Sequence, residues 1–305
     1  MQTNDAFIKE VNGILKPDQF FVDEPMSRHT TFKIGGPADY LFFPSSMEEV
    51  TQVWEVLERY HIPVTILGNG SNVLVLDKGI RGAVIKFGAF FSQIRHEGNR
   101  IFAGAGAMLK DVSQYAASYG LTGMEFAVGI PGSVGGAVFM NAGAYNGEMK
   151  NIVHGVHAVA PNGKVVYYTA NEIAFGYRHS VFQENGQAIC EVEIDLLPGE
   201  RNSIESQMTD LTARREKKQP LEMPSAGSTF KRPEGYFAGT LIESSGLKGF
   251  QVGGAQISAK HAGFVINAGN ATAADVLNLI KEVQSRVYKE KGVKLFPEVR
   301  IIGEE

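Results

Sequence analysis

Apolar residues recur along the chain at two spacings, which together predict a fold that mixes helices and strands. Spacings of three and four residues, typical of amphipathic helices, occur over 50–57, 109–119, 204–211 and 276–287. Short apolar or alternating runs, typical of strands, occur over 38–44, 63–67, 73–76, 81–87, 100–105, 153–159, 165–169, 188–197 and 294–303. The chain has no internal repeat. We therefore expect an α+β protein.

Cap and turn residues indicate where several of these elements begin and end. Ser46–Glu49 and Thr272–Asp275 both have the pattern of a capping box ahead of a helix. The second of these helices is the longest, and we expect it to stop at Gly292. Asn162-Gly163 lies between two apolar runs and predicts a hairpin. A short helix over 4–15 is expected to be an appendage.

The length of 305 residues corresponds to about two to three domains. Pro198-Gly199 follows a predicted strand and precedes a predicted helix, so it is a plausible boundary. We predict three parts, at 1–88, 89–200 and 201–305.

Composition excludes several classes of protein. A hydrophobic fraction of 44% and a charged fraction of 20% are typical of a folded globular chain. The net charge of −4 creates no general attraction to nucleic acid or to an anionic membrane. The first residues lack the pattern of a signal peptide, and no apolar run reaches the roughly 18 residues of a membrane span. We expect a cytoplasmic protein without nucleic-acid, membrane or obligatory protein partners.

The positions of cysteine and histidine in the sequence give little support for a metal site or a disulfide. Cys190 is the only cysteine, which excludes an internal disulfide, and its apolar surroundings predict a small buried side chain. The seven histidines are scattered. His154 and His157 are close in sequence, but alternation along a strand would place them on opposite faces. We predict no metal site.

Glycine is the unusual component. Of 35 glycines, 18 lie between Gly35 and Gly147, although neither a P-loop nor a Rossmann fingerprint is present. Two tracts stand out, Leu67–Asn72 and Gly129–Gly147. Backbone amides near such glycines form concavities that bind phosphate oxygens, although ordinary tight turns would also explain the composition.

Charged residues gather in two places of the last third of the chain. Arg214–Lys218, Lys231 and Arg232 flank Ser228, and this local positive charge suits either an anionic ligand or a solvated helix end. Glu298 and Arg300 would share one face of the last predicted strand. They form either a surface pair or a proton-handling group with its electrostatic partner.

Six short blocks connect these features. They are Leu67–Asn72, Gly129–Gly136, Asn141–Tyr145, Tyr177-Arg178, Ala226–Phe230 and Pro297–Gly303. In this order and spacing they resemble the UDP-N-acetylenolpyruvoylglucosamine reductase family (MurB), from about Thr30 to the end of the chain. The chain is similar to the shorter form typical of many Gram-positive bacteria, because there is no room between Tyr177 and Cys190 for the tyrosine-bearing loop of the longer form.

The resemblance implies a fold and two redox partners. It implies two N-terminal domains of the vanillyl-alcohol-oxidase (PCMH) type that hold FAD non-covalently, and a C-terminal α+β domain that covers the substrate. NADPH is the implied co-substrate. The implied FAD contacts are Gly68, Asn69, Gly70, Ser71, Asn72, Gly132, Ser133, Gly135, Gly136 and Ala137.

The resemblance also implies a reaction. Hydride passes to the terminal vinyl carbon of the enolpyruvyl ether of UDP-N-acetylglucosamine, and a proton passes to the carbon beside the carboxylate. Ser228 is the implied proton donor, and Arg178 and Glu298 stabilise the enol intermediate. Because a serine hydroxyl is a weak acid, Lys218 is a hypothetical helper. The implied substrate contacts are Tyr145, Arg215, Lys218, Arg232 and Arg300.

Two other functions compete with this one. Another flavin oxidase or dehydrogenase of the same fold would usually carry a histidine for covalent flavin attachment, and the glycine tracts contain none. An FAD- or nucleotide-binding protein without catalysis would not need Arg178, Ser228 and Glu298 together.

Overall fold

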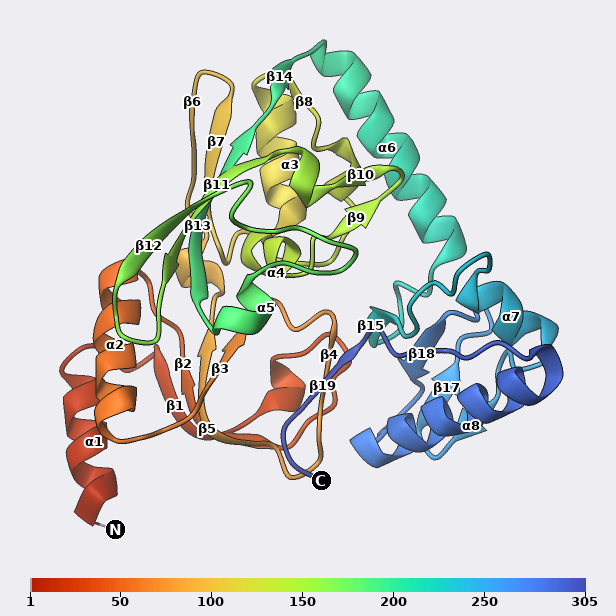
Figure 1. Cartoon of the computed structure of the whole chain (residues 1–305), viewed down its shortest axis with the longest axis horizontal. Helices are drawn as coiled ribbons and strands as arrows, with labels where there is room; N and C mark the ends of the chain where they lie inside the picture. The colour runs from red at the N-terminus through yellow and green to blue at the C-terminus, as the bar shows by residue number, and fades with distance from the viewer. Residues whose placement is uncertain (1) are drawn as a thin grey trace. The chain divides into compact units, whose positions relative to one another are not determined.

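The computed structural model describes residues 2–305, with side chains from residue 5. The chain forms two compact units (Figure 1). Unit 1 contains the chain up to Val22, together with Tyr40–Asn69 and Gly82–Arg214. Unit 2 combines Asp23–Asp39, Gly70–Arg81 and Arg215–Glu305. Each unit has its own apolar core, and Phe32 and Leu74 belong to the core of unit 2 although they come from the N-terminal part of the chain.

Helices form where the apolar spacing predicts them, and three further short helices occur. The helices are α1 (Gln2–Asn12), α2 (Met47–Arg59), α3 (Leu109–Ser118), α4 (Val134–Phe139), α5 (Phe182–Asn185), α6 (Arg201–Lys218), α7 (Ala238–Ser244) and α8 (Ala273–Lys291). Within residues 2–305, none of them is both long enough and apolar enough to cross a membrane.

Strands form three larger sheets and three strand pairs. The first sheet has the order β1 (Phe20–Pro25), β2 (Pro37–Phe42), β5 (Ile80–Lys86), β3 (Val64–Leu67). The second has the order β12 (Val165–Thr169), β11 (Val153–Val159), β13 (Ala188–Asp195), β7 (Arg100–Gly104), β6 (Ile94–Glu97). The third has the order β15 (Ser225–Ser228), β18 (Phe264–Asn267), β17 (Ala255–Ile257), β16 (Gln251–Val252). The pairs are β9 (Gly143–Ala144) with β10 (Gly147–Glu148), β8 (Leu121–Thr122) with β14 (Leu197–Pro198), and β4 (Val73–Val75) with β19 (Arg300–Ile302).

The prediction that the first helix is an appendage is wrong. Phe7 and Val11 on α1 are buried in the core of unit 1, and Figure 1 shows α1 beside α2. The Phe7 ring lies 4.8 Å from the Tyr40 ring and 5.4 Å from the Tyr60 ring, measured between centroids. Aromatic contacts of this kind stabilise the fold by more than the burial of their apolar surface alone.

The capping box at α2 forms only in part. The Ser46 hydroxyl accepts a hydrogen bond from the Glu49 N–H, as predicted. In a complete capping box the Glu49 carboxylate would accept a hydrogen bond from the N–H of Ser46. Here it accepts one from the N–H of Ser45, at 2.6 Å. At α8 both halves of the box are present between Thr272 and Asp275, and the helix ends at Gly292 in the left-handed conformation, as predicted.

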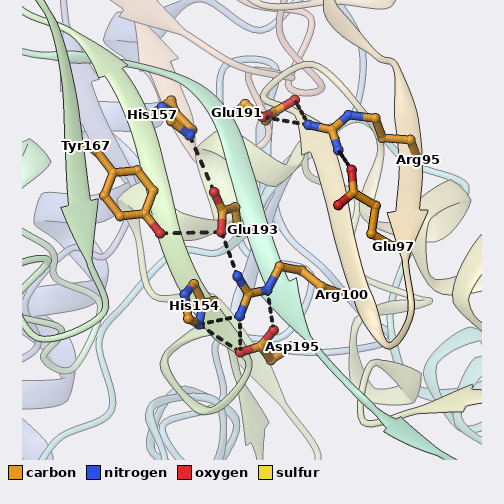
Figure 2. Close-up of polar contacts among 9 residues, drawn as sticks. All are labelled: Arg95, Glu97, Arg100, His154, His157, Tyr167, Glu191, Glu193 and Asp195. Atoms are coloured by element: carbon orange, nitrogen blue, oxygen red, sulfur yellow. Dashed lines mark hydrogen bonds and ion pairs between the residues drawn. The ribbon is translucent and has the colours of Figure 1, made fainter.

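The hairpin of β11 and β12 is confirmed, with Val159 opposite Val165. The prediction that His154 and His157 face opposite sides of the strand is wrong. A register shift between Val153 and Gly155 interrupts the alternation at His154. Both imidazoles consequently reach carboxylates of β13, which are Asp195 and Glu193 respectively (Figure 2).

The face of the second sheet that Figure 2 shows carries a network of ion pairs. Arg100 donates to Asp195 at 2.7 Å and lies 3.3 Å from Glu193. The Arg100 guanidinium lowers the pKa of the Asp195 carboxyl. Among the described residues, no group of three histidine, cysteine, aspartate or glutamate side chains is arranged to hold a metal ion.

The predicted C-terminal strand over 294–303 is mostly wrong. Only Arg300–Ile302 forms a strand, β19, which pairs in parallel with β4. Glu298 lies before β19, so strand alternation does not relate it to Arg300. The apolar run does contain the buried residues Leu295 and Val299, but they pack in the core of unit 2 without a continuous ladder.

Cys190 is buried in β13, as predicted, and we expect it to be chemically inert. Burial raises the pKa of its thiol to about 12, so the reactive thiolate is scarce at neutral pH. Iodoacetamide at pH 8 should label the native protein at a small fraction of the rate seen in denaturant, measured by mass spectrometry. Rapid native labelling would contradict this assignment.

Asp77 should contribute to the stability of unit 2. Its carboxylate accepts hydrogen bonds from the N–H groups of Ala273 and Ala274 in the first turn of α8, at 2.8 and 3.0 Å. Asp77→Ala removes these bonds and should lower the free energy of unfolding by about 1 kcal/mol. A urea titration tests this, with Glu290→Ala on the exposed surface of α8 as the control. Equal midpoints for the two variants would contradict the capping role.

Candidate active site

In unit 1 the first glycine tract packs against the second. The Gly68 carbonyl accepts a hydrogen bond from Lys86 Nζ at 2.8 Å. The Asn69 side chain donates to the Pro131 carbonyl, also at 2.8 Å. A Cβ atom on Gly68 would lie 2.5 Å from Ser133 Oγ, which is closer than real Cβ contacts. The two tracts therefore approach each other at a point where a larger residue than glycine does not fit.

Ser133 carries an unusual hydroxyl at this point. Its Oγ is buried, and within the described residues it has no hydrogen-bond partner, although it stands immediately before α4. Gly136 lies next to it, where an added Cβ would meet only Ser133 Oγ, at 3.5 Å. A buried hydroxyl without a partner is rare in folded proteins. The residues between the two tracts thus fit an oxygen-rich group such as a phosphate.

Other glycines of the second tract have packing roles. A Cβ on Gly135 would lie 2.8 Å from the Cβ of Ala105, and a Cβ on Gly147 would lie 2.5 Å from the Phe126 ring. Tyr145 and Asn146 both have positive φ, 50° and 68°, and form the turn between β9 and β10. Part of the glycine excess therefore serves the fold.

Tyr145 and Arg178 both lie in unit 1 on tight turns. The Tyr145 hydroxyl donates to the Leu211 carbonyl at 3.4 Å. Arg178 has a φ of 54°, which is strained for a residue other than glycine, within a turn closed by Gly176 and His179.

Two polar side chains hold the turn that carries Arg178. Gln183 donates to the Arg178 carbonyl at 2.9 Å. The buried Asn141 side chain, from the second glycine tract, donates to the Gly176 carbonyl at 2.9 Å. Asn141 is therefore joined by a hydrogen bond to the turn that carries Arg178, which restrains the backbone of that turn.

Gly70 and Ser71 lie in unit 2. Gly70 has a φ of 70°, and a Cβ there would lie 2.4 Å from the His29 carbonyl oxygen. The Gly70 carbonyl accepts from the Thr31 N–H at 3.2 Å. The local backbone thus requires glycine at position 70, whether or not a ligand binds there.

Unit 2 brings Ser228, Asn72 and Glu298 to one place. Ser228 is exposed at the end of β15, and the carbonyl of the next residue, Thr229, accepts the Glu298 N–H at 2.8 Å. The Asn72 side chain donates to the Glu298 carbonyl at 3.4 Å. The Asn72 carbonyl accepts the Arg300 N–H at 2.9 Å. Three distant blocks of the sequence therefore meet through backbone hydrogen bonds.

The predicted basic substrate contacts in unit 2 have different surroundings. Arg232 stacks on Phe237, with the guanidinium carbon 4.0 Å from the ring centroid. Lys218 is exposed in the last turn of α6, whereas Arg215 Nε is buried. Burial lowers the pKa of Arg300, but an arginine remains charged at neutral pH.

Lys86 and His261 are two further candidate residues that are not among those predicted from the sequence. Lys86 is buried at the end of β5, and the signal was a lysine in the otherwise apolar run 81–87. His261 is half-buried, and burial lowers its pKa, with the charge of Lys218 acting in the same direction. Its Nδ1 accepts the Gly263 N–H at 3.0 Å, so the neutral ring carries its proton on Nε2. The sequence contains no local motif that indicates His261.

Comparison with known proteins identifies the family. Residues 219–302 match the UDP-N-acetylenolpyruvoylglucosamine reductase C-terminal domain, and residues 38–168 match an FAD binding domain. A UDP-N-acetylenolpyruvoylglucosamine reductase of Clostridium perfringens (strain SM101) is 52% identical over 299 residues, which cover 98% of each chain. The chain belongs to the UDP-N-acetylenolpyruvoylglucosamine reductase (MurB) family. It is therefore an FAD-containing oxidoreductase.

Solved structures agree with membership of the MurB family. MurB from Thermus caldophilus superposes with a TM-score of 0.80 at 36% identity, covering 93% of this chain and 98% of that one. An alkyldihydroxyacetonephosphate synthase superposes with a TM-score of 0.50 at 16% identity over 63% of this chain and 40% of that one, which shows a shared fold alone. The fold is α+β, with a PCMH-type FAD-binding module followed by a C-terminal α+β domain.

Gly68→Ala tests the contact between the two glycine tracts. The new methyl group would either turn the Ser133 hydroxyl away or separate the tracts, so FAD affinity should fall at least tenfold. Quenching of flavin fluorescence measures the dissociation constant. Gly88→Ala is the matched control, because its added Cβ would make only an ordinary contact with Phe43, at 3.8 Å. Wild-type affinity in Gly68→Ala would contradict the role of this contact.

Proposed function

We propose that this protein reduces the enolpyruvyl ether of UDP-N-acetylglucosamine to UDP-N-acetylmuramate, with NADPH as reductant, in the cytoplasmic synthesis of peptidoglycan precursors. The observation that carries the proposal is the meeting of Ser228, Asn72 and Glu298 in unit 2. Ser228 and Glu298 both lie within the segment that matches the C-terminal domain of the family. Bound FAD would supply the hydride-transfer chemistry between NADPH and the terminal vinyl carbon.

Both glycine tracts would hold the FAD. Ser133 Oγ lacks a partner in the described residues and is positioned between Gly68 and Gly136 to hydrogen-bond a phosphate oxygen. Amides of loops rich in glycine bind phosphates without a lysine side chain. We assign Asn69, Gly70, Ser71, Asn72, Gly132, Gly135 and Ala137 to the same role, in agreement with the position of both tracts in the matched FAD binding domain.

Ser228 is the proposed proton donor. Hydride addition to the vinyl carbon leaves an electron pair on the carbon beside the carboxylate, and a proton on that carbon completes the reduction. The Ser228 hydroxyl is exposed and is held by the antiparallel pairing of β15 with β18. A serine hydroxyl is a weak acid, so a nearby cation such as Lys218 would assist by stabilising the alkoxide.

Two other residues would stabilise the enol intermediate. The Arg178 guanidinium is a fixed cation suited to a carboxylate that gains negative charge, and its turn is held by Gln183 and Asn141. Glu298 is half-buried next to the backbone that carries Ser228, and we assign it to the stabilisation of the enol.

The substrate carries a diphosphate, and cations in unit 2 would bind it. We assign this role to Arg215, Lys218, Arg232 and Arg300, and we also assign Tyr145 to substrate binding. Arg232 is oriented by its contact with the Phe237 ring, and an arginine positioned in this way binds phosphate oxygens with less loss of side-chain freedom.

Ser228→Ala separates the two halves of the reaction. NADPH should still bleach the flavin absorbance at the wild-type rate, because Ser228 has no part in that step. Reoxidation by the enolpyruvyl substrate should slow by about 100-fold or more, which is typical for the loss of a general acid. Anaerobic stopped-flow spectroscopy measures both steps, with Ser285→Ala on the exposed surface of α8 as the control. Wild-type reoxidation in Ser228→Ala would remove Ser228 from the mechanism.

A further inference from the structure

Lys86 occupies an unusual position for a lysine. It is the only lysine or arginine in the buried class among the side chains that the structure describes, with 9% of its surface exposed. It lies at the end of β5, which pairs in parallel with β3, and Lys86 is opposite Leu67 in that pairing. The first glycine tract begins directly after Leu67. Lys86 is thus placed beside the point where the chain leaves the sheet and enters the tract.

The contact of Lys86 is with the backbone of the tract. Its Nζ donates a hydrogen bond to the Gly68 carbonyl at 2.8 Å. Gly68 has no side chain, so its backbone can adopt conformations that other residues avoid. Such a loop takes one defined shape only when groups outside it restrain its peptide bonds. Lys86 is one such group, and a further hydrogen bond, from the Asn69 side chain to the Pro131 carbonyl, ties the tract to the second tract.

The restraint acts on an amide as well as on a carbonyl. A trans peptide group is planar, so its C=O and the following N–H point in opposite directions. When Lys86 holds the Gly68 carbonyl, it also sets the direction of the Asn69 N–H, which points away from the lysine. Amides of this kind are the groups that a glycine loop offers to a phosphate oxygen.

We propose that Lys86 is a positioning residue that locks the Gly68–Asn69 peptide group, and with it the first glycine tract, in the orientation that binds FAD. The proposal rests on the assignment of the two glycine tracts to FAD. It differs from that assignment because Lys86 acts through the backbone and lies outside both tracts.

The burial of Lys86 supports a functional role over a stabilising one. Burial lowers the pKa of its ammonium group to about 8. The folded protein therefore holds the protonated amine less readily than the unfolded chain does, so at neutral pH the charged side chain weakens folding. Functional sites often contain residues that lower the stability of the folded protein while they order a binding loop.

The test compares Lys86→Met, Lys86→Gln and the exposed control Lys164→Met. Two quantities are measured for each. The first is the dissociation constant of FAD, from the flavin fluorescence released when the holoenzyme is diluted. The second is the thermal midpoint of the protein after removal of FAD. Methionine has a similar length and no donor, whereas glutamine retains an N–H donor.

We expect Lys86→Met to weaken FAD binding about tenfold or more, as for the loss of a hydrogen bond from a charged donor. Its cofactor-free thermal midpoint should be equal to or higher than that of the wild type, because the penalty of burying the charge is gone. Lys86→Gln should recover part of the affinity, and Lys164→Met should match the wild type in both measurements.

Two outcomes would overturn the proposal. One is wild-type FAD affinity in Lys86→Met. The other is a loss of affinity that is accompanied by a lower cofactor-free midpoint and is not relieved by glutamine, which would indicate a general structural role. Gly68→Ala distinguishes this failure from failure of the FAD assignment. If Gly68→Ala weakens FAD binding and Lys86→Met does not, the tracts hold FAD and only the role of Lys86 is wrong.

Discussion

The parallel pairing of β4 with β19 is the interaction on which the candidate catalytic groups of unit 2 depend. It joins Val73–Val75 to Arg300–Ile302 and continues into the hydrogen bond between the Asn72 carbonyl and the Arg300 N–H. The backbone immediately before β19 in turn contacts Thr229, the residue after Ser228. The pairing acts together with the hydrogen bonds of Glu298 to Asn72 and Thr229, which connect the end of the first glycine tract to the segment that carries Ser228. Each strand contributes only three residues, so the apolar core of unit 2 must stabilise the arrangement.

Unit 1 depends on close approach between backbones. Gly68 and Gly135 both lack room for a side chain, the first against Ser133 and the second against Ala105. Such contacts leave main-chain groups and short hydroxyls, in place of long side chains, at the surface that we propose binds FAD. They also explain why a buried lysine is found there. A tract that is rich in glycine lacks internal restraints, and the fold supplies one from the neighbouring strand β5.

Much of the secondary structure was predictable because its signals are local. The α8 capping box, its stop at Gly292 and the hairpin of β11 and β12 depend on residues adjacent in sequence, and all three are confirmed. The wrong predictions concern features that depend on contacts between residues far apart in the sequence. Helix α1 was predicted to be an appendage because nothing local shows that Phe7 meets Tyr40 and Tyr60. A bulge at His154, set by pairing with β13, put two histidines on one face.

The sequence by itself determined the family, because six ordered motifs are specific even without coordinates, and the same motifs supplied the predicted site residues. It also indicated the glycine tracts, since their composition is unusual. Only the tertiary structure decided that unit 2 combines three separated segments and that Thr229, the residue after Ser228, accepts a backbone hydrogen bond from Glu298. It also decided which glycines serve packing and which surround the unpaired Ser133 hydroxyl. The physical reason is that these facts depend on contacts between residues far apart in the chain, which periodicity and local propensity do not encode.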